Sequence, residues 1–252
     1  MTRLPLVLAL VLAFGALKLP IERRLSLEHR ALHFQGVEFN FNLREQLGQM
    51  GFVAALSGFR SLVADVLFIQ AHAAWEKTEW GRVLFFFRQA TTLQPRSILF
   101  WDMAAWHMAW NASAAALLDQ TWTRQALRVK AQREYFEIGR DFLERGIQNN
   151  PEKPQLYESL ARLYKDKYND HWHASQLFAQ AARLPEARSY DKRFAAYELS
   201  YCEGKEKEAY EELHRLYQMG PSERLPTLIA RLKFLETRLG IPAEERIPDP
   251  SR

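Results

Sequence analysis

The chain has 252 residues, of which 48% are hydrophobic and 25% are charged, so it can bury a sizeable core and is not expected to be disordered over most of its length. The formal net charge of +4 comes from basic residues scattered among acidic ones, which argues against a nucleic-acid partner. The single cysteine, Cys202, excludes an internal disulfide and completes no metal-binding motif.

The amino-terminal segment predicts a membrane anchor. Residues 4–19 form an apolar run of about 24 Å at ~1.5 Å per residue, short of the roughly 30 Å of a bilayer core, although Lys18 can snorkel. We expect residues 1–20 to be an uncleaved signal anchor, with a cleaved signal peptide as the alternative. The expected location is a single span in the inner membrane with the body in the periplasm. The basic residues after the run, among them Arg23 and Arg24, favour the opposite orientation.

An amphipathic connector is expected next, over residues 21–49, and a helical domain over residues 50–240. No part of this domain shows the alternating pattern of β-branched residues that is typical of strands, so the predicted fold is all-α. Its last helix is expected between Leu225 and Leu239, where leucines recur at helical spacing. Residues 241–252 are polar and rich in proline, which predicts a disordered tail.

Four prolines divide the helical domain into units. Pro95, Pro151, Pro185 and Pro221 are separated by 56, 34 and 36 residues. A period near 34 residues is typical of repeats built from two antiparallel helices. The longer first interval therefore indicates one unit with an insertion near residues 111–133.

Large and small apolar residues alternate within these units at helical spacing. In the first unit Ala71, Phe87 and Ala90 precede Pro95, and small residues of this kind let two helices approach closely while aromatic rings fill the adjoining space. The corresponding positions of the later units are Trp101, Ala105, Leu143 and Gly146 in the second, Tyr157, Ala161, Tyr164, Ala174, Phe178 and Ala181 in the third, and Ala209, Leu213 and Leu216 in the fourth.

On these residues, the stretch from about 62 to 221 resembles the tetratricopeptide-repeat family. The resemblance implies a right-handed stack of antiparallel helical hairpins, an α-solenoid with a concave binding surface. The units depart from the family pattern in being degenerate, and the first small position of the family is never glycine here. Residues 43–111 also resemble a group of uncharacterised bacterial proteins with an amino-terminal membrane anchor, which implies no activity.

Candidate binding residues gather on the helix expected from about residue 98 to 118. Trp106 and Trp110 are four apart and share a face, while Trp101 and His107 lie beside them, so an aromatic groove for a partner is one interpretation. Packing of these rings inside the repeat core is the alternative. Arg60 and Asp65 are charges in an apolar setting and are further candidates for a functional surface.

The sequence predicts no catalytic residues, no cofactor and no metal site. It contains no glycine-rich phosphate loop, nucleophile elbow or His-Glu-x-x-His motif. Asp170, His171 and His173 could in principle bind zinc, but a turn between two helices accounts for them better.

We therefore expect a non-catalytic, membrane-anchored scaffold that binds a protein or peptide partner in a cell-envelope assembly. The alternative is a protein or enzyme subunit that binds a small ligand, such as a glycan, lipid or cofactor, along the helix 98–118.

Overall fold

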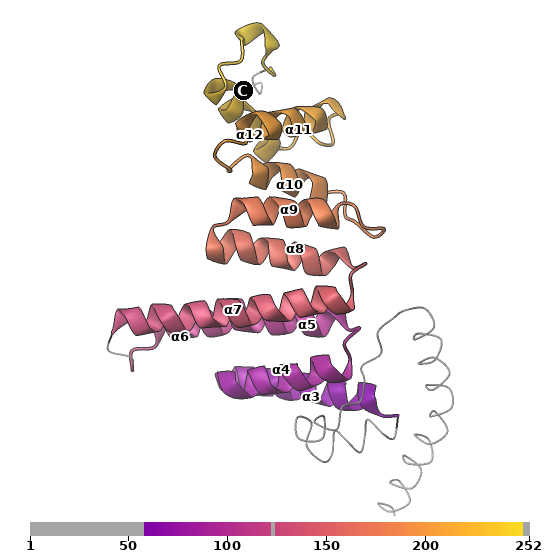
Figure 1. Ribbon diagram of the computed structural model, residues 1–252, viewed down its shortest axis with the longest axis vertical. Helices are drawn as coiled ribbons and strands as arrows, with labels where there is room; N and C mark the ends of the chain where they lie inside the picture. Colours follow the sequence, from indigo (N-terminus) through magenta and orange to yellow (C-terminus); the bar gives the residue numbers. More distant parts are fainter. Residues whose placement is uncertain (1–57, 122–123, 249–252) are drawn as a thin grey trace, which may run out of the picture.

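The computed structural model describes residues 58–121 and 124–248, and within these ranges the protein is helical and contains no strand (Figure 1). The predicted all-α fold is confirmed for this part of the chain. None of the helices in these ranges is long and apolar enough to cross a membrane. The predicted anchor (1–20) and connector (21–49) lie outside the described residues.

The described helices are α3 (Arg60–Glu76), α4 (Trp80–Leu93), α5 (Ile98–Trp106), α6 (Ser113–Leu118), α7 (Gln125–Asn149), α8 (Pro154–Leu163), α9 (His171–Ala181), α10 (Asp191–Leu199), α11 (Glu206–Gln218) and α12 (Pro226–Arg238). Two π-helical turns, η1 (His107–Ala112) and η2 (Tyr164–Tyr168), continue α5 and α8, and a short 3-10 helix, η3 (Ala243–Glu245), follows α12.

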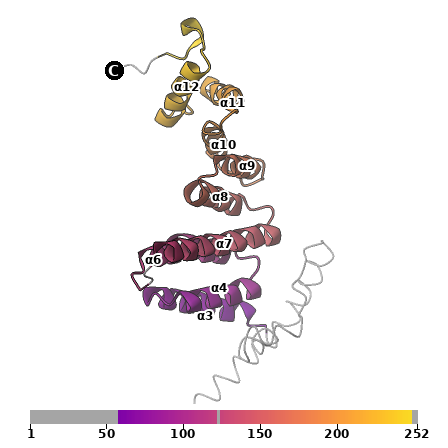
Figure 2. The ribbon, with the colours of Figure 1, turned by 60° about the vertical axis from the view of Figure 1, so that its left-hand side comes forward.

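The helices succeed one another in chain order along an elongated body (Figures 1 and 2). Four pairs recur: α3 with α4, the segment α5–η1–α6 with α7, the segment α8–η2 with α9, and α10 with α11, after which α12 packs on α11. Each of the four prolines that delimit the expected units lies in the connection between one pair and the next element.

Local sequence explains where these helices begin. Pro154 and Pro226 occupy the first turns of α8 and α12, where a missing amide hydrogen leaves no bond unmade. Asp170 caps α9, since its Oδ1 accepts a hydrogen bond from the backbone N–H of His173 at 3.0 Å. Asn169, just before it, has a φ of 53°, which lets the chain reverse between η2 and α9.

Two main clusters of buried side chains hold the body together. The aromatic core lies between α3 and α8 and combines large rings, such as Phe87, Trp101 and Phe142, with many alanines. The leucine core lies between α10 and α12 and is built mainly from Leu213, Leu216, Leu228, Leu232 and Leu235.

The second pair is the longest, and its outer end projects beyond the neighbouring helices (Figure 1). This end contains residues 113–121 and 124–133, which correspond to nearly all of the described part of the expected insertion at 111–133.

The carboxyl-terminal segment differs from the expected disordered tail. Residues 241–248 are described, and Ile247 is buried against the leucine core. The backbone N–H of Ile247 donates to Oε1 of the buried Glu236 at 2.6 Å, and Lys233 donates to the carbonyl of Ile247. A single apolar residue among polar neighbours therefore ties this segment to α12.

Candidate functional site

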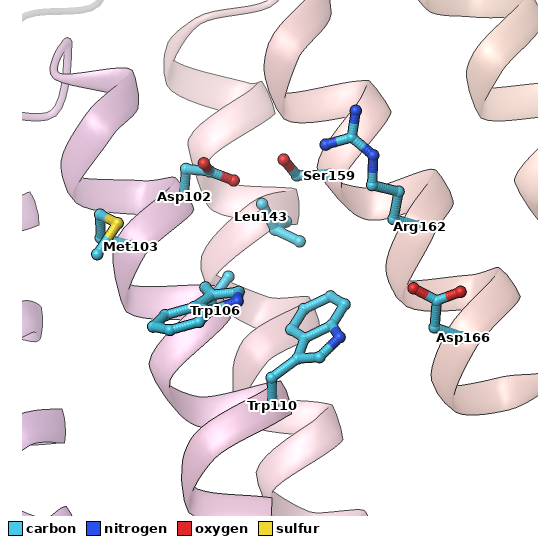
Figure 3. Close-up of a pocket in the computed structure, with 9 residues that line it drawn as sticks. Asp102, Met103, Trp106, Trp110, Leu143, Ser159, Arg162 and Asp166 are labelled. Carbon is cyan, nitrogen blue, oxygen red and sulfur yellow. The ribbon is translucent and has the colours of Figure 1, made fainter.

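A groove of about 440 Å³ lies between the first helices of the second and third pairs (Figure 3). One wall comes from α5 and η1, the other comes from α8 and η2, and Leu143 of α7 lies behind them. The lining side chains are Asp102, Met103, Ala105, Trp106, Trp110, Leu143, Ser159, Arg162 and Asp166. The spacing of Asp102, Trp106 and Trp110 places them on one face of their helix, as does that of Ser159, Arg162 and Asp166 on theirs.

The two tryptophans in the groove differ in what covers them. The Trp110 ring is half-buried, and Nζ of Lys167 lies 5.0 Å from its centroid, within the range of a cation–π contact. The Trp106 side chain is 43% exposed, and no cation of the described residues lies over its ring. The ring of Trp106 therefore provides an apolar surface inside the groove that a ligand can contact.

Charged side chains border the groove at both ends. Figure 3 shows Asp102, Ser159 and Arg162 at one end and Asp166 beside Trp110. Arg162 is held in place because its Nη2 donates to Oε2 of Glu158 at 3.3 Å. Glu158 is buried and also accepts a hydrogen bond from the hydroxyl of Tyr190, the residue directly before α10, at 2.8 Å, so the start of the fourth pair supports this wall from behind. The site thus combines an apolar centre with fixed polar groups at its rim.

Both walls contain a π-helical turn. Trp110 belongs to η1 and Asp166 belongs to η2, and each turn directly continues the α-helix that carries the rest of its wall. Such turns are rare and occur frequently at functional sites, because the wider turn changes which side chains face a surface.

Trp101 belongs to the core, not to the groove. Its side chain is 1% exposed, and its Nε1 donates to the carbonyl oxygen of Pro95 at 2.8 Å. The guanidinium of Arg145 lies over the ring, 5.5 Å from the centroid. Trp101 therefore fixes the turn that precedes α5 and does not contact a ligand in the groove.

His107 is also buried, and it faces α3 and α4. Its ring lies 5.1 Å from those of His72 and Trp75 and is stacked on Phe87 at 5.4 Å. Burial, followed by the nearby His72, lowers its pKa to about 4, so the ring is neutral near pH 7. Its Nδ1 is 3.1 Å from Nδ2 of Asn111, which donates to it. His107 thus holds η1 against the first pair of helices.

Arg60 and Asp65 lie on α3, away from the groove lining. Nη2 of Arg60 donates to the carbonyl oxygen of Leu93 at 2.9 Å. The Asp65 carboxylate is exposed, and Nε2 of Gln94 is 3.5 Å from its Oδ1. These contacts connect the beginning of α3 to the end of α4. The six residues proposed from the sequence therefore divide among the groove, the core and this edge.

Sequence reasoning missed the second wall of the groove. Ser159, Arg162 and Asp166 come from the third unit, and the helical spacing that places them on one face is visible in the sequence. Nothing in the sequence pairs that face with Trp106, which lies about fifty residues earlier. Asp102 was missed for a different reason, since a lone carboxylate on a helix is usually just a solvated group.

The Asp170 segment forms a cap. Oδ2 of Asp170 lies 2.7 Å from Nδ1 of His173, and Nδ1 of His171 lies 2.7 Å from Oε2 of Glu198. Within residues 58–121 and 124–248, no group of three or more His, Cys, Asp or Glu side chains is arranged to hold a metal ion.

The described residues therefore form an all-helical body. Between its second and third pairs of helices lies an aromatic groove that is bordered by charged and polar side chains. No model of a known protein family matches the chain, and no curated protein matches it.

Proposed function

We propose that this protein is a non-catalytic scaffold of tetratricopeptide-like repeats, which binds an extended or helical segment of a partner protein in the groove between α5 and α8. The observation that carries the proposal is Trp106, a large ring that is 43% exposed inside a groove with a polar rim. Exposed aromatic anchors surrounded by polar groups are typical of binding hot spots. The right-handed solenoid is part of this proposal and is supported by the succession of four helix pairs.

Three exposed rings in the carboxyl-terminal half differ from Trp106 because cations of the protein cover them. Trp172 is 40% exposed, with Nζ of Lys205 4.8 Å from its centroid. Tyr201 and Phe234 share the guanidinium of Arg231, which lies 3.9 Å and 4.6 Å from their centroids. Covering a ring in this way reduces the apolar surface available to a partner. Trp75 and Phe85 are also exposed without such a cation among the described residues, but neither lines the groove. Trp106 is an uncovered ring inside the groove, and this combination supports the groove as the contact surface.

The proposal includes a membrane anchor in residues 1–20 and a body in the periplasm, where it would belong to an assembly of the cell envelope. The apolar run at residues 4–19 supports the anchor. Deleting residues 1–20 is expected to release the protein from membranes in a high-salt wash. If the shortened chain remained in the membrane fraction after a high-salt wash, the anchor would lie elsewhere.

Site-specific photo-crosslinking tests the groove. A photoreactive amino acid replaces Ser159 in the full chain, in its native membranes, and trapped molecules are identified by mass spectrometry. Trp106→Ala should reduce the yield of the crosslinked partner protein roughly thirtyfold, as expected for a hot spot of about 2 kcal/mol. Trp172→Ala is the matched control, because it removes a ring of similar exposure outside the groove.

The same experiment separates the second candidate function, the binding of a small ligand. The groove volume of about 440 Å³ falls within the usual range of small-molecule sites, which favours this candidate. A trapped glycan, lipid or cofactor in place of a protein would support it. Equal effects of Trp106→Ala and Trp172→Ala, or no crosslink from position 159, would contradict both functions for this groove.

A further inference from the structure

The outer end of the second helix pair projects beyond the neighbouring helices (Figure 1). It consists of the end of α6, residues 119–121, and the first half of α7. At ~1.5 Å per residue, α7 is about 37 Å long, and its first part extends past the neighbouring helices (Figure 1). This projection is convex and is separate from the groove between α5 and α8.

Positive charge concentrates on the projection. Residues 124–133 contain four basic side chains, Arg124, Arg128, Lys130 and Arg133, and no acidic one. Arg124, Lys130 and Arg133 are exposed. Nζ of Lys130 lies 3.8 Å from Oε1 of Glu134, but both side chains are largely exposed, so solvent screens this pair. Against these four positive charges stand Asp119 and Glu134, so residues 119–121 and 124–134 carry a net charge of +2 (four basic minus two acidic residues).

Large apolar side chains lie among these charges. Leu118, at the end of α6, is 71% exposed, and Leu127 of α7 is 42% exposed. Leu127 and Arg128 lie in the first turn of α7, and Arg124 is the residue directly before the helix. A leucine as exposed as Leu118 makes no contribution to the core, so the arrangement suits an apolar environment outside the protein.

The apolar surface continues from Leu118 towards the body. A hollow of about 640 Å³ lies between α4, α6 and α7, and its lining includes Leu118, Trp80, Leu84, Tyr135 and Ile138. Leu118 is thus the outer part of a larger apolar surface, on which Asp119 and Glu134 are the charged lining residues. The four basic side chains lie beyond this hollow, towards the tip.

We propose that the projection docks on an anionic lipid surface, with Leu118 and Leu127 inserted at the level of the headgroups and the four basic side chains on lipid phosphates. Basic residues near exposed leucines are the pattern of interfacial membrane binding, because lysine and arginine are attracted to anionic headgroups while the leucines leave water. A nucleic acid would satisfy the charges but would leave the leucines in water, and a polyanionic partner, whether nucleic acid or protein, is an outcome that the test below distinguishes. This contact goes beyond the proposed scaffold function, since it is independent of residues 1–20 and of the groove.

A fluorescent label at the projection tests the proposal in the full chain. Leu118→Cys is labelled with an environment-sensitive dye in a Cys202→Ser background, and the protein is reconstituted into or mixed with vesicles of phosphatidylcholine, with and without phosphatidylglycerol. Quenching by a spin-labelled lipid should increase severalfold when phosphatidylglycerol is present. A label at the exposed Gln148, near the other end of α7 and about 30 Å along the helix, should not respond.

A charge-neutralised variant provides the second readout. Changing Arg124, Arg128, Lys130 and Arg133 to Gln should weaken docking roughly a hundredfold or more in low salt and remove the effect of phosphatidylglycerol. The matched control removes the same charge from α9–α11 with R183Q/K192Q/K207Q/R215Q and should leave quenching unchanged. Equal quenching in both kinds of vesicle, or equal quenching of the two labels, would overturn the proposal. Binding of the four basic residues to soluble heparin without quenching by lipid would replace the membrane with a polyanionic partner.

Discussion

The aromatic core and the leucine core belong to the same succession of helices but use different chemistry. In the aromatic core, rings such as Phe87 and Trp101 pack against alanine and glycine, so helices approach closely. In the leucine core, branched side chains of similar size fill the space, and charged groups such as Glu236 and Arg231 connect the elements.

This difference shows why the groove lies in the aromatic half. A core that packs very large side chains against very small ones requires many aromatic residues on its helices. One consequence is that α5 carries more aromatic residues than the core buries. Trp101 is enclosed, whereas Trp106 reaches the groove. In the leucine half, the exposed rings Tyr201 and Phe234 are covered by Arg231.

The largest expected effect comes from breaking the aromatic core alone. Phe87 is fully buried, and Phe87→Ala should destabilise the protein by about 3–5 kcal/mol through lost burial and a residual cavity. Because each pair of helices contacts mainly its neighbours, hydrogen exchange should accelerate in α3–α5 more than in α10–α12.

Leu213→Ala is the matched variant in the leucine core and should cost about 2–5 kcal/mol, with faster exchange chiefly in α10–α12. If each variant accelerated exchange equally in all helices, the two cores would unfold as one cooperative unit. The aromatic core and the leucine core would then not differ in local stability.

The next largest effect is a pH dependence confined to the aromatic half. The pKa of His107 is lowered to about 4 by burial and by His72, against about 6.5 in an unfolded chain. Between these values the unfolded state binds more protons, so the free energy of unfolding decreases as the pH falls from 6.5 to 4. The contribution is complete above pH 6.5, and its loss amounts to about 3 kcal/mol.

Denaturant unfolding at pH 7 and pH 4.5 measures this contribution. His107→Phe preserves a ring against Phe87 and should reduce the loss of stability between the two pH values. His214→Gln, on α11, should leave the loss as it is in the natural chain. A loss of equal size with and without the His107 imidazole would assign the acid sensitivity to carboxylates instead.

The sequence predicted the helices well because their signals are local. The proline spacing marked the connections between pairs, and Ala71, Phe87 and Ala90 are buried as the repeated large and small pattern required. The tail was less predictable, since Ile247 is one apolar residue in a polar context, and only its contact with Glu236 reveals its role.

The groove could be predicted only in part. Trp106 and Trp110 both line it, as residues four apart on one helix should. Their neighbour His107 does not, because one residue along a helix turns the side chain by about 100° and directs it towards α3 and α4. The opposite wall depends on how α8 packs beside α5, which no local pattern specifies.

The smallest of these effects tests the close helix approach that distinguishes the aromatic core. A Cβ on Gly139 would lie 2.7 Å from Cβ of Ala109 and 3.0 Å from the backbone oxygen of Ala105, so Gly139→Ala must push α7 away from α5. The expected cost is about 1–3 kcal/mol, even though alanine favours a helix over glycine.

Gly81→Ala is the matched control: Gly81 lies in α4 with open space around it, so this change should be neutral or stabilise by up to about 1 kcal/mol. Thermal unfolding of both variants measures the difference, and a Gly139→Ala protein as stable as Gly81→Ala would mean that α5 and α7 can separate freely. In that case the wall that carries Trp106 would not be rigidly positioned by the core, and the link between the aromatic core and the groove would fail.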